Sequence, residues 1–137
     1  MREQSDRNAI LSEAVKLLKE AYPKYTWVGI YLLEGQELVL HNYIGKPSPH
    51  TKIALGKGIC GAAANEGRSI IVPDVNKDAR YLACSIDTRS EIVVPIMSNR
   101  RVYGEIDIDS DRLDIFHEGD REILESISAL LTRIWTR

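Results

Sequence analysis

Two cysteines are the only thiols in this 137-residue chain, and the sequence around each indicates a different chemistry. Cys84 lies in a polar stretch between Arg80 and Arg89. Neighbouring cations lower the pKa of a thiol, and the thiolate is the nucleophilic form of cysteine. A loop position also gives a small molecule access to the sulfur. Cys84 is therefore a candidate nucleophile, and an ordinary loop thiol is the equally supported alternative.

Cys60 stands between Ile59 and three consecutive alanines, in a segment bounded by Gly58 and Gly67. The segment predicts a short helix with Cys60 near its N-terminus, where the helix dipole favours a thiolate. Free cysteines are nevertheless among the most often buried residues, and the neighbours here are small and apolar. We therefore favour a packing role for Cys60 over a chemical one.

Three carboxylates alternate with isoleucines in the last segment that has the pattern of a strand. The period of two puts Glu105, Asp107 and Asp109 together on one face of that strand. Aspartate is depleted in strands, and like charges two residues apart on one face repel. The pattern therefore predicts a compensating partner, which could be an ammonium group, a metal ion, an arginine or a shared proton. A solvent-exposed polar face is the simpler alternative.

Two aromatic residues share a face of an earlier strand, because Trp27 and Tyr31 are four positions apart with Gly29 between them. One interpretation is that both rings belong to the core. The other is an aromatic wall that is open over Gly29, where a small apolar group of a ligand could rest.

The remaining pattern predicts the elements that must position these residues. We expect a first helix with Ser5 as its cap and Pro23 as its stop, and a last helix after Phe116. The last helix should present one apolar face, made of Ile123, Leu124, Ile127, Leu130, Leu131 and Ile134. Between the helices we expect strands at 25–33, 38–43, 52–55, 69–72, 91–98 and 102–110, a short helix at 58–67 and a long loop at 74–89 with a helical turn near 77–81.

Hairpins flanked by terminal helices predict an α+β fold, an antiparallel sheet with helices packed on it. The length is that of one domain, so we expect a single domain over residues 1–137.

Composition excludes several classes of protein. The formal net charge of −2 gives no electrostatic footprint for nucleic acid, and no apolar run is long enough to span a membrane. The charged N-terminus has no signal-peptide pattern, and two cysteines do not suggest a disulfide scaffold, so we expect a cytoplasmic protein with reduced thiols.

The three histidines are scattered and no metal motif occurs, so we expect no metal. Residues 56–61 match G-x-G-x-x-G, but the helix that follows has room for only about two turns, so we expect no dinucleotide cofactor.

Taken in order, several short stretches resemble GAF domains, and more closely the free methionine-(R)-sulfoxide reductases, which are single-domain GAF enzymes. The matching stretches are 27–32 (WVGIYL), 58–61 (GICG), 83–84 (AC), 90–95 (SEIVVP), Gly104 and 106–110 (IDIDS). The resemblance implies a GAF-like sheet and reduction of free L-methionine-(R)-sulfoxide to methionine. It also implies a homodimer and a dithiol reductant such as thioredoxin.

The resemblance assigns roles to the candidate residues. Cys84 matches the catalytic cysteine, whose thiolate would attack the sulfoxide sulfur and become a sulfenic acid. The carboxylates that hold the substrate amino group and assist protonation are matched by Glu91, Asp107 and Asp109. The aromatic enclosure around the substrate methyl group is matched by Trp27 and Tyr31. Cys60 matches a second cysteine that does not usually take the catalytic step.

Two positions depart from the family pattern. His50 stands where the family has a resolving cysteine, and Glu105 stands where an apolar residue is more usual. The resolving thiol would then be Cys60 or an external thiol. Two other functions stay open on the sequence: a GAF sensor that binds methionine or another small ligand without catalysis, and a structural module that dimerises through its terminal helices.

Overall fold

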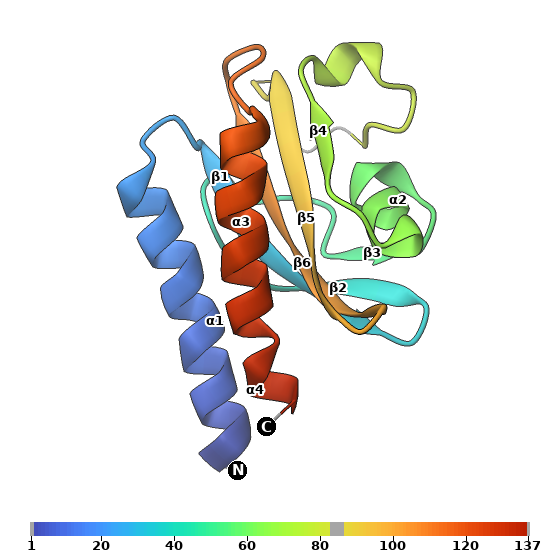
Figure 1. Cartoon of the computed structure of the whole chain (residues 1–137). Coiled ribbons are helices and arrows are strands. Elements are labelled where there is room, and N and C mark those ends of the chain that lie inside the picture. The colour runs from blue at the N-terminus through green and yellow to red at the C-terminus, as the bar shows by residue number, and fades with distance from the viewer. Residues whose placement is uncertain (1, 83–86, 137) are drawn as a thin grey trace.

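The computed structural model describes residues 2–82 and 87–136, which form one antiparallel sheet with helices on both faces (Figure 1). In chain order the elements are α1 (Arg2–Ala21), β1 (Trp27–Glu34), β2 (Glu37–Ile44), β3 (Lys52–Ala54), α2 (Gly58–Glu66), β4 (Ile70–Val72), a 3-10 turn (Val75–Lys77), β5 (Ser90–Ser98), β6 (Arg101–Ser110), α3 (Glu118–Leu131) and α4 (Arg133–Thr136). The described strands lie in the order β3-β2-β1-β6-β5-β4. This confirms the α+β fold with an antiparallel sheet.

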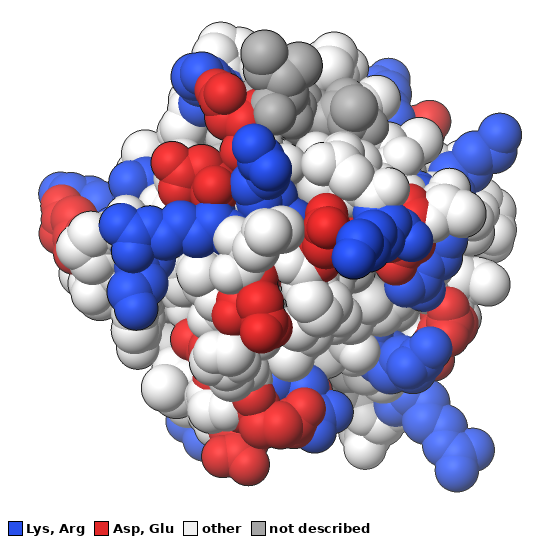
Figure 2. Space-filling model, turned by 90° about the horizontal axis from the view of Figure 1, so that it is seen from above, with Lys and Arg blue, Asp and Glu red and all other residues white. Residues whose placement is uncertain are grey.

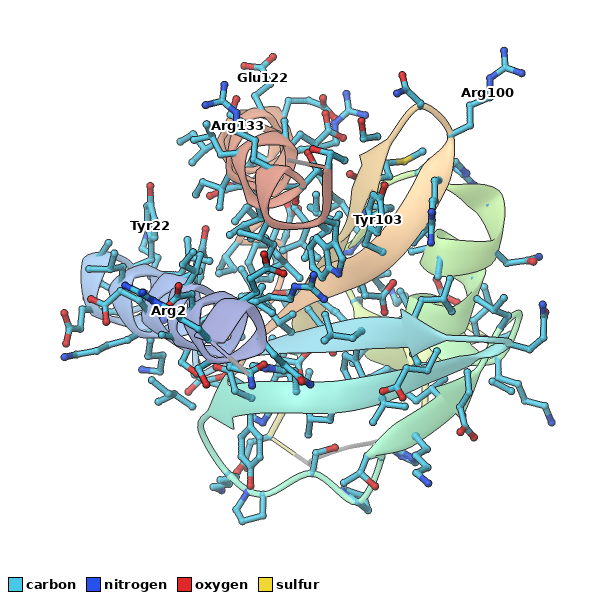
Figure 3. The ribbon with its side chains drawn as sticks, turned by 90° about the horizontal axis from the view of Figure 1, so that it is seen from below. Arg2, Tyr22, Arg100, Tyr103, Glu122 and Arg133 are labelled. Carbon is cyan, nitrogen blue, oxygen red and sulfur yellow. The ribbon has the colours of Figure 1, made fainter. Side chains whose placement is uncertain are left out.

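The strands alternate their side chains between two cores, as the period of two requires. On one face, Val28 pairs with Ile108 and Ile30 pairs with Ile106, and these side chains pack under α1 and α3. On the other face, β1 and β5 pack against the alanine-rich side of α2. Seen from below, α1 and α3 lie together on one side of the sheet and α2 lies on the other (Figure 3). The sheet therefore separates a mostly aliphatic core from a second, smaller core under α2.

The two long hairpins turn more tightly than the sequence alone predicts. Strands β1 and β2 extend to Glu34 and Glu37, so the predicted four-residue loop is a two-residue turn with Gly35 at φ +66°. At the turn between β5 and β6, Asn99 and Arg100 both have positive φ, 51° and 67°. Left-handed backbone at both central positions is the hairpin geometry that matches the twist of the strands.

Three predictions about the helices are wrong in detail. Helix α1 already includes Ser5, so Ser5 is not its cap. The buried face of the last helix is narrower than the six expected residues, since Leu124 is buried whereas Ile123 is 46% and Leu130 57% exposed. The helical turn in the long loop covers Val75–Lys77 rather than 77–81, because the Asp74 side chain accepts a hydrogen bond from the Asn76 backbone N–H and begins the turn there.

The surface matches the near-neutral charge of the chain. Basic and acidic side chains are interspersed over the face drawn in Figure 2. Among the described residues, no helix is long and apolar enough to cross a membrane.

Candidate active site

The acidic face of β6 is buried instead of facing solvent. Glu105, Asp107 and Asp109 are 0%, 2% and 3% exposed, on the side of the sheet that α2 covers. Strand pairing places them beside β1 and β5: Asp107 lies opposite Gly29, and Asp109 opposite both Trp27 and Glu91. The prediction that the three carboxylates share one face is confirmed, and the alternative of an exposed polar face is wrong.

Burial of so many carboxyl groups in one place controls their protonation. Burial raises the pKa of Glu105 well above its ordinary value, and the charge of Asp107 raises it further. Burial and the charge of Asp107 likewise raise the pKa of Asp109, against the opposing effect of a hydrogen bond with Glu91. Burial also raises the pKa of Asp107, which hydrogen-bonds to Glu91 too. Ionised carboxylates are costly to bury without a counter-ion, so the cluster retains protons at a pH where exposed carboxyls have lost them.

Helix α2 brings Cys60 onto this cluster. The Cys60 sulfur, a Glu91 oxygen and an Asp107 oxygen all lie within 4.8 Å of one another. The helix can approach because Gly61 has no side chain: a Cβ there would lie 2.6 Å from the carbonyl oxygen of Ala54. Burial raises the pKa of Cys60 well above its usual value, and the charges of the neighbouring carboxylates add to this. The packing role expected for Cys60 fits this position, and the helix dipole does not make it a thiolate.

A small cavity of about 20 Å³ opens between the cluster and the covering segments. Its walls are Tyr31, His50, Ile53, Gly58, Ile59, Cys60, Leu82, Glu91 and Asp107. This volume takes about one water-sized group. A larger ligand with the same contacts therefore requires these walls to move apart.

Trp27 does not leave the space over Gly29 open, so that interpretation of the aromatic pair is wrong. The indole of Trp27 folds across Gly29, where a Cβ would lie 2.3 Å from its Cη2 atom. Its Nε1 donates a 2.9 Å hydrogen bond to the Lys46 carbonyl, and its ring stacks on Tyr43. The ring rests there because a glycine presents no side chain to exclude it.

Tyr31 differs from Trp27 in lining the cavity. Its hydroxyl donates a 2.8 Å hydrogen bond to the His50 carbonyl. The two aromatic residues thus fasten the segment between β2 and β3 over the acidic face, one at each end.

Cys84 itself lies outside the described residues, which resume at Asp87. Before Cys84 in the chain, Leu82 lines the cavity. After it, Asp87 forms an ion pair with Lys46. Arg80, one of the two cations expected to act on Cys84, is hydrogen-bonded to Asp78 at 2.7 Å. That carboxylate is its partner among the described residues.

Glu105 is the site residue that the sequence interpretation set aside. The alternation of β6 already placed it with Asp107 and Asp109, and that signal was sufficient to find it. The grouping of Cys60 with Glu91 and Asp107 left no such signal, because the three come from α2, β5 and β6 and no local spacing records it.

Comparison with known proteins identifies the family of this chain. The GAF domain family matches residues 6–134. The free methionine-R-sulfoxide reductase of Saccharomyces cerevisiae is 40% identical over 131 residues, which are 90% of this chain and 72% of that protein. The structure of a type II free methionine-R-sulfoxide reductase from Thermoplasma acidophilum has a TM-score of 0.93 at 38% identity, covering 96% of this chain and 94% of the other.

A second solved structure, a free methionine-R-sulfoxide reductase from Neisseria meningitidis in complex with its substrate, has a TM-score of 0.90 at 37% identity, covering 95% of this chain and 78% of the other. These likenesses extend over the strands and helices that carry the acidic face and Cys60. The chain belongs to the GAF domain family and, within it, to the free methionine-R-sulfoxide reductases, which are oxidoreductases.

Proposed function

We propose that this protein reduces free L-methionine-(R)-sulfoxide to methionine with Cys84 as the nucleophile. The observation that carries the proposal is the buried acidic face beside the cavity. In the described part of the chain, neither Glu105, Asp107 nor Asp109 is in an ion pair with a lysine or arginine. Buried carboxylates without a protein counter-ion are a suitable receptor for a ligand ammonium group, and a free amino acid has one.

In the proposed reaction, oxygen passes from the substrate to the catalytic thiol. The Cys84 thiolate attacks the sulfoxide sulfur, a carboxylic acid protonates the departing oxygen, and methionine and a Cys84 sulfenic acid result. The substrate sulfur is reduced by two electrons and the cysteine sulfur is oxidised by two. Glu91 and Asp109 are the proposed acid, because they share a hydrogen bond at the edge of the cavity. Asp107 is proposed to hold the ammonium group.

The aromatic residues are proposed to enclose the rest of the substrate. Tyr31 lines the cavity directly. The Trp27 indole covers Gly29, which pairs with Asp107 across the sheet, so it closes the side of the acidic face toward β2. The substrate methyl group would pack between these rings.

We propose that an external dithiol such as thioredoxin regenerates Cys84, rather than Cys60. A thiol resolves a sulfenic acid as its thiolate, and the raised pKa of the buried Cys60 opposes that form. The same chemistry requires reduced thiols, so we place the protein in the cytoplasm.

The homodimer is proposed to form through the helices on the far side of the sheet from the acidic face. Two of their apolar residues are strongly exposed, Leu17 of α1 at 55% and Leu130 of α3 at 57%. A second copy of the chain would cover them. Sedimentation of the wild type and of Leu17→Glu tests this: we expect a dimer that the substitution weakens, and a monomeric wild type would contradict it.

The function is tested by turnover of separated methionine sulfoxide epimers with dithiothreitol or thioredoxin as reductant. We expect turnover of the free R epimer and none in Cys84→Ser. A wild-type protein that binds methionine without turning over its sulfoxide would make the chain a sensor. Intact-mass measurement after one turnover tests regeneration: we expect a gain of one oxygen on Cys84, and a disulfide between Cys60 and Cys84 would contradict the external route.

A further inference from the structure

We propose that Cys60, Glu91 and Asp107 form a binding site for a zinc-class divalent cation. The three potential ligand atoms come from α2, β5 and β6, lie within 4.8 Å of one another, and are all buried. No metal motif in the sequence predicts this site, because such motifs describe ligands that are close in the chain, whereas these three come together only in the folded protein.

Unpartnered oxygens point to a cation as the missing component. Oδ1 of Asp107 is buried and has no hydrogen-bond partner in the described parts of the chain, where the buried Glu105 carboxyl has only the weak thiol donor of Cys60. The Glu105 carboxyl lies beside the Cys60 thiol, so its oxygens belong to the same cluster. Buried polar atoms without a partner are rare in folded proteins and indicate an ion or water that completes them.

The sulfur decides which cation fits. A ligand ammonium group would use only the carboxylates, and a hard cation such as Mg²⁺ or Ca²⁺ prefers oxygen ligands alone. One thiolate with two carboxylates is a donor set for Zn²⁺ or a similar borderline ion. Ligand atoms around tetrahedral zinc are about 3.4–3.6 Å apart, so the Glu91 and Asp107 side chains would rotate modestly to close the set.

The cavity supplies the remaining coordination position. Cys60, Glu91 and Asp107 all line it, and it takes about one water-sized group. Three protein ligands and one water would thus complete the four-coordinate shell of a zinc ion. Binding would release a proton from Cys60 and remaining protons from the carboxyl groups, because metal ligands bind in their deprotonated forms.

Occupation of this site would block the proposed substrate site. The ion would neutralise Glu91 and Asp107, which are the groups proposed to protonate the oxygen and hold the ammonium. Zinc would therefore inhibit reversibly and in competition with the substrate. Only this consequence rests on the proposed reductase function, and the binding site itself does not.

Titration with Co²⁺ alone tests the site. Fully reduced protein, freed of thiol reductants because these chelate metals, should bind one Co²⁺ per chain with a thiolate-to-cobalt charge-transfer absorption that Zn²⁺ abolishes. Cys60→Ala should lose the absorption, and this change suits a helix that already carries three alanines at 62–64. Cys84→Ser should keep it. Glu91→Gln, which keeps the side-chain shape, should weaken binding by more than about tenfold.

Three results would overturn the proposal: no charge-transfer absorption in the wild type, an unchanged absorption in Cys60→Ala, or its loss in Cys84→Ser. Thermal unfolding of each variant checks that it is folded. Inhibition is measured separately, as single-turnover methionine formation by pre-reduced protein with and without Zn²⁺, and high substrate should relieve it. Cobalt binding in a protein without reductase activity would leave the metal site standing and reject the reductase, so the two failures are distinguishable.

Discussion

Glu91 on β5 is the direct cross-strand neighbour of Asp109 on β6, and their carboxyl groups hydrogen-bond on the buried face of the sheet. Ionised carboxylates only accept hydrogen bonds, so a hydrogen bond between two carboxyl groups requires one of them to carry a proton. Burial raises the pKa of Asp109 and so favours keeping that proton. The pair therefore holds a transferable proton at the wall of the cavity that Glu91 lines.

Replacing one member of this pair should remove the acid without changing its shape. We expect Asp109→Asn to slow single-turnover methionine formation by about 10²–10⁴-fold, the usual contribution of a positioned acid. The matched control is Asp111→Asn, the same substitution at an exposed position two residues further along. The two rates are compared on pre-reduced protein. An unchanged rate in Asp109→Asn would mean that Asp109 takes no part in protonation.

Glu105 should lower the stability of the fold. Its side chain is completely buried, and among the described residues its carboxyl group has only the weak hydrogen bond of the Cys60 thiol. We expect Glu105→Leu to raise the free energy of unfolding by about 1–3 kcal/mol, because leucine of similar volume removes a buried unsatisfied group.

Urea unfolding measures this difference. Glu37→Leu, at the exposed start of β2, is the control and should change stability by less than about 0.5 kcal/mol. A strongly destabilised Glu105→Leu would show that Glu105 has a native partner that holds it in place.

Sequence reasoning succeeded where the information is local. The period of two in β6 determines which side chains share a face, so the grouping of Glu105 with Asp107 and Asp109 was predictable. It failed where a contact depends on packing between distant elements. Nothing near Cys60 in the sequence shows that α2 places it against Asp107, and nothing near Trp27 shows that its ring folds over Gly29 instead of standing beside it.

The buried carboxyl groups should make the protein less stable as the pH rises. Folding raises the pKa of Glu105, Asp107 and Asp109 through burial, so the folded chain holds protons that the unfolded chain releases. Their contribution is fully present below the unfolded pKa of about 4 and is lost as the pH rises through the raised folded values. Each additional proton that the folded chain holds lowers the free energy of unfolding by about 1.4 kcal/mol per pH unit.

Urea unfolding in a chelating buffer at a series of pH values above about 4 measures this slope. Glu105→Gln removes one titrating group and should make the slope shallower. A stability that is constant or rises over this range would mean that the carboxyl groups are ionised in the folded protein.

The contact between Trp27 and Gly29 predicts the effect of adding a single methyl group. In Gly29→Ala the Cβ would meet Cη2 and Cζ3 of the indole at 2.3 and 2.6 Å, so the ring must leave its place. The displaced ring would break the hydrogen bond from Nε1 to the Lys46 carbonyl, which fastens the segment over the acidic face. We expect a loss of about 1–3 kcal/mol in the free energy of unfolding and a raised KM for the sulfoxide.

Gly119→Ala is the matched control, because Gly119 lies in α3 and no atom of the described residues lies within 4 Å of a new Cβ there. Alanine there should stabilise the helix by about 0.5–1 kcal/mol and leave KM unchanged. A Trp135→Phe background makes Trp27 the single tryptophan, so its fluorescence reports the ring directly. If Gly29→Ala kept both the wild-type stability and the wild-type emission, the ring would have room to spare over Gly29. Trp27 would then not close that side of the site.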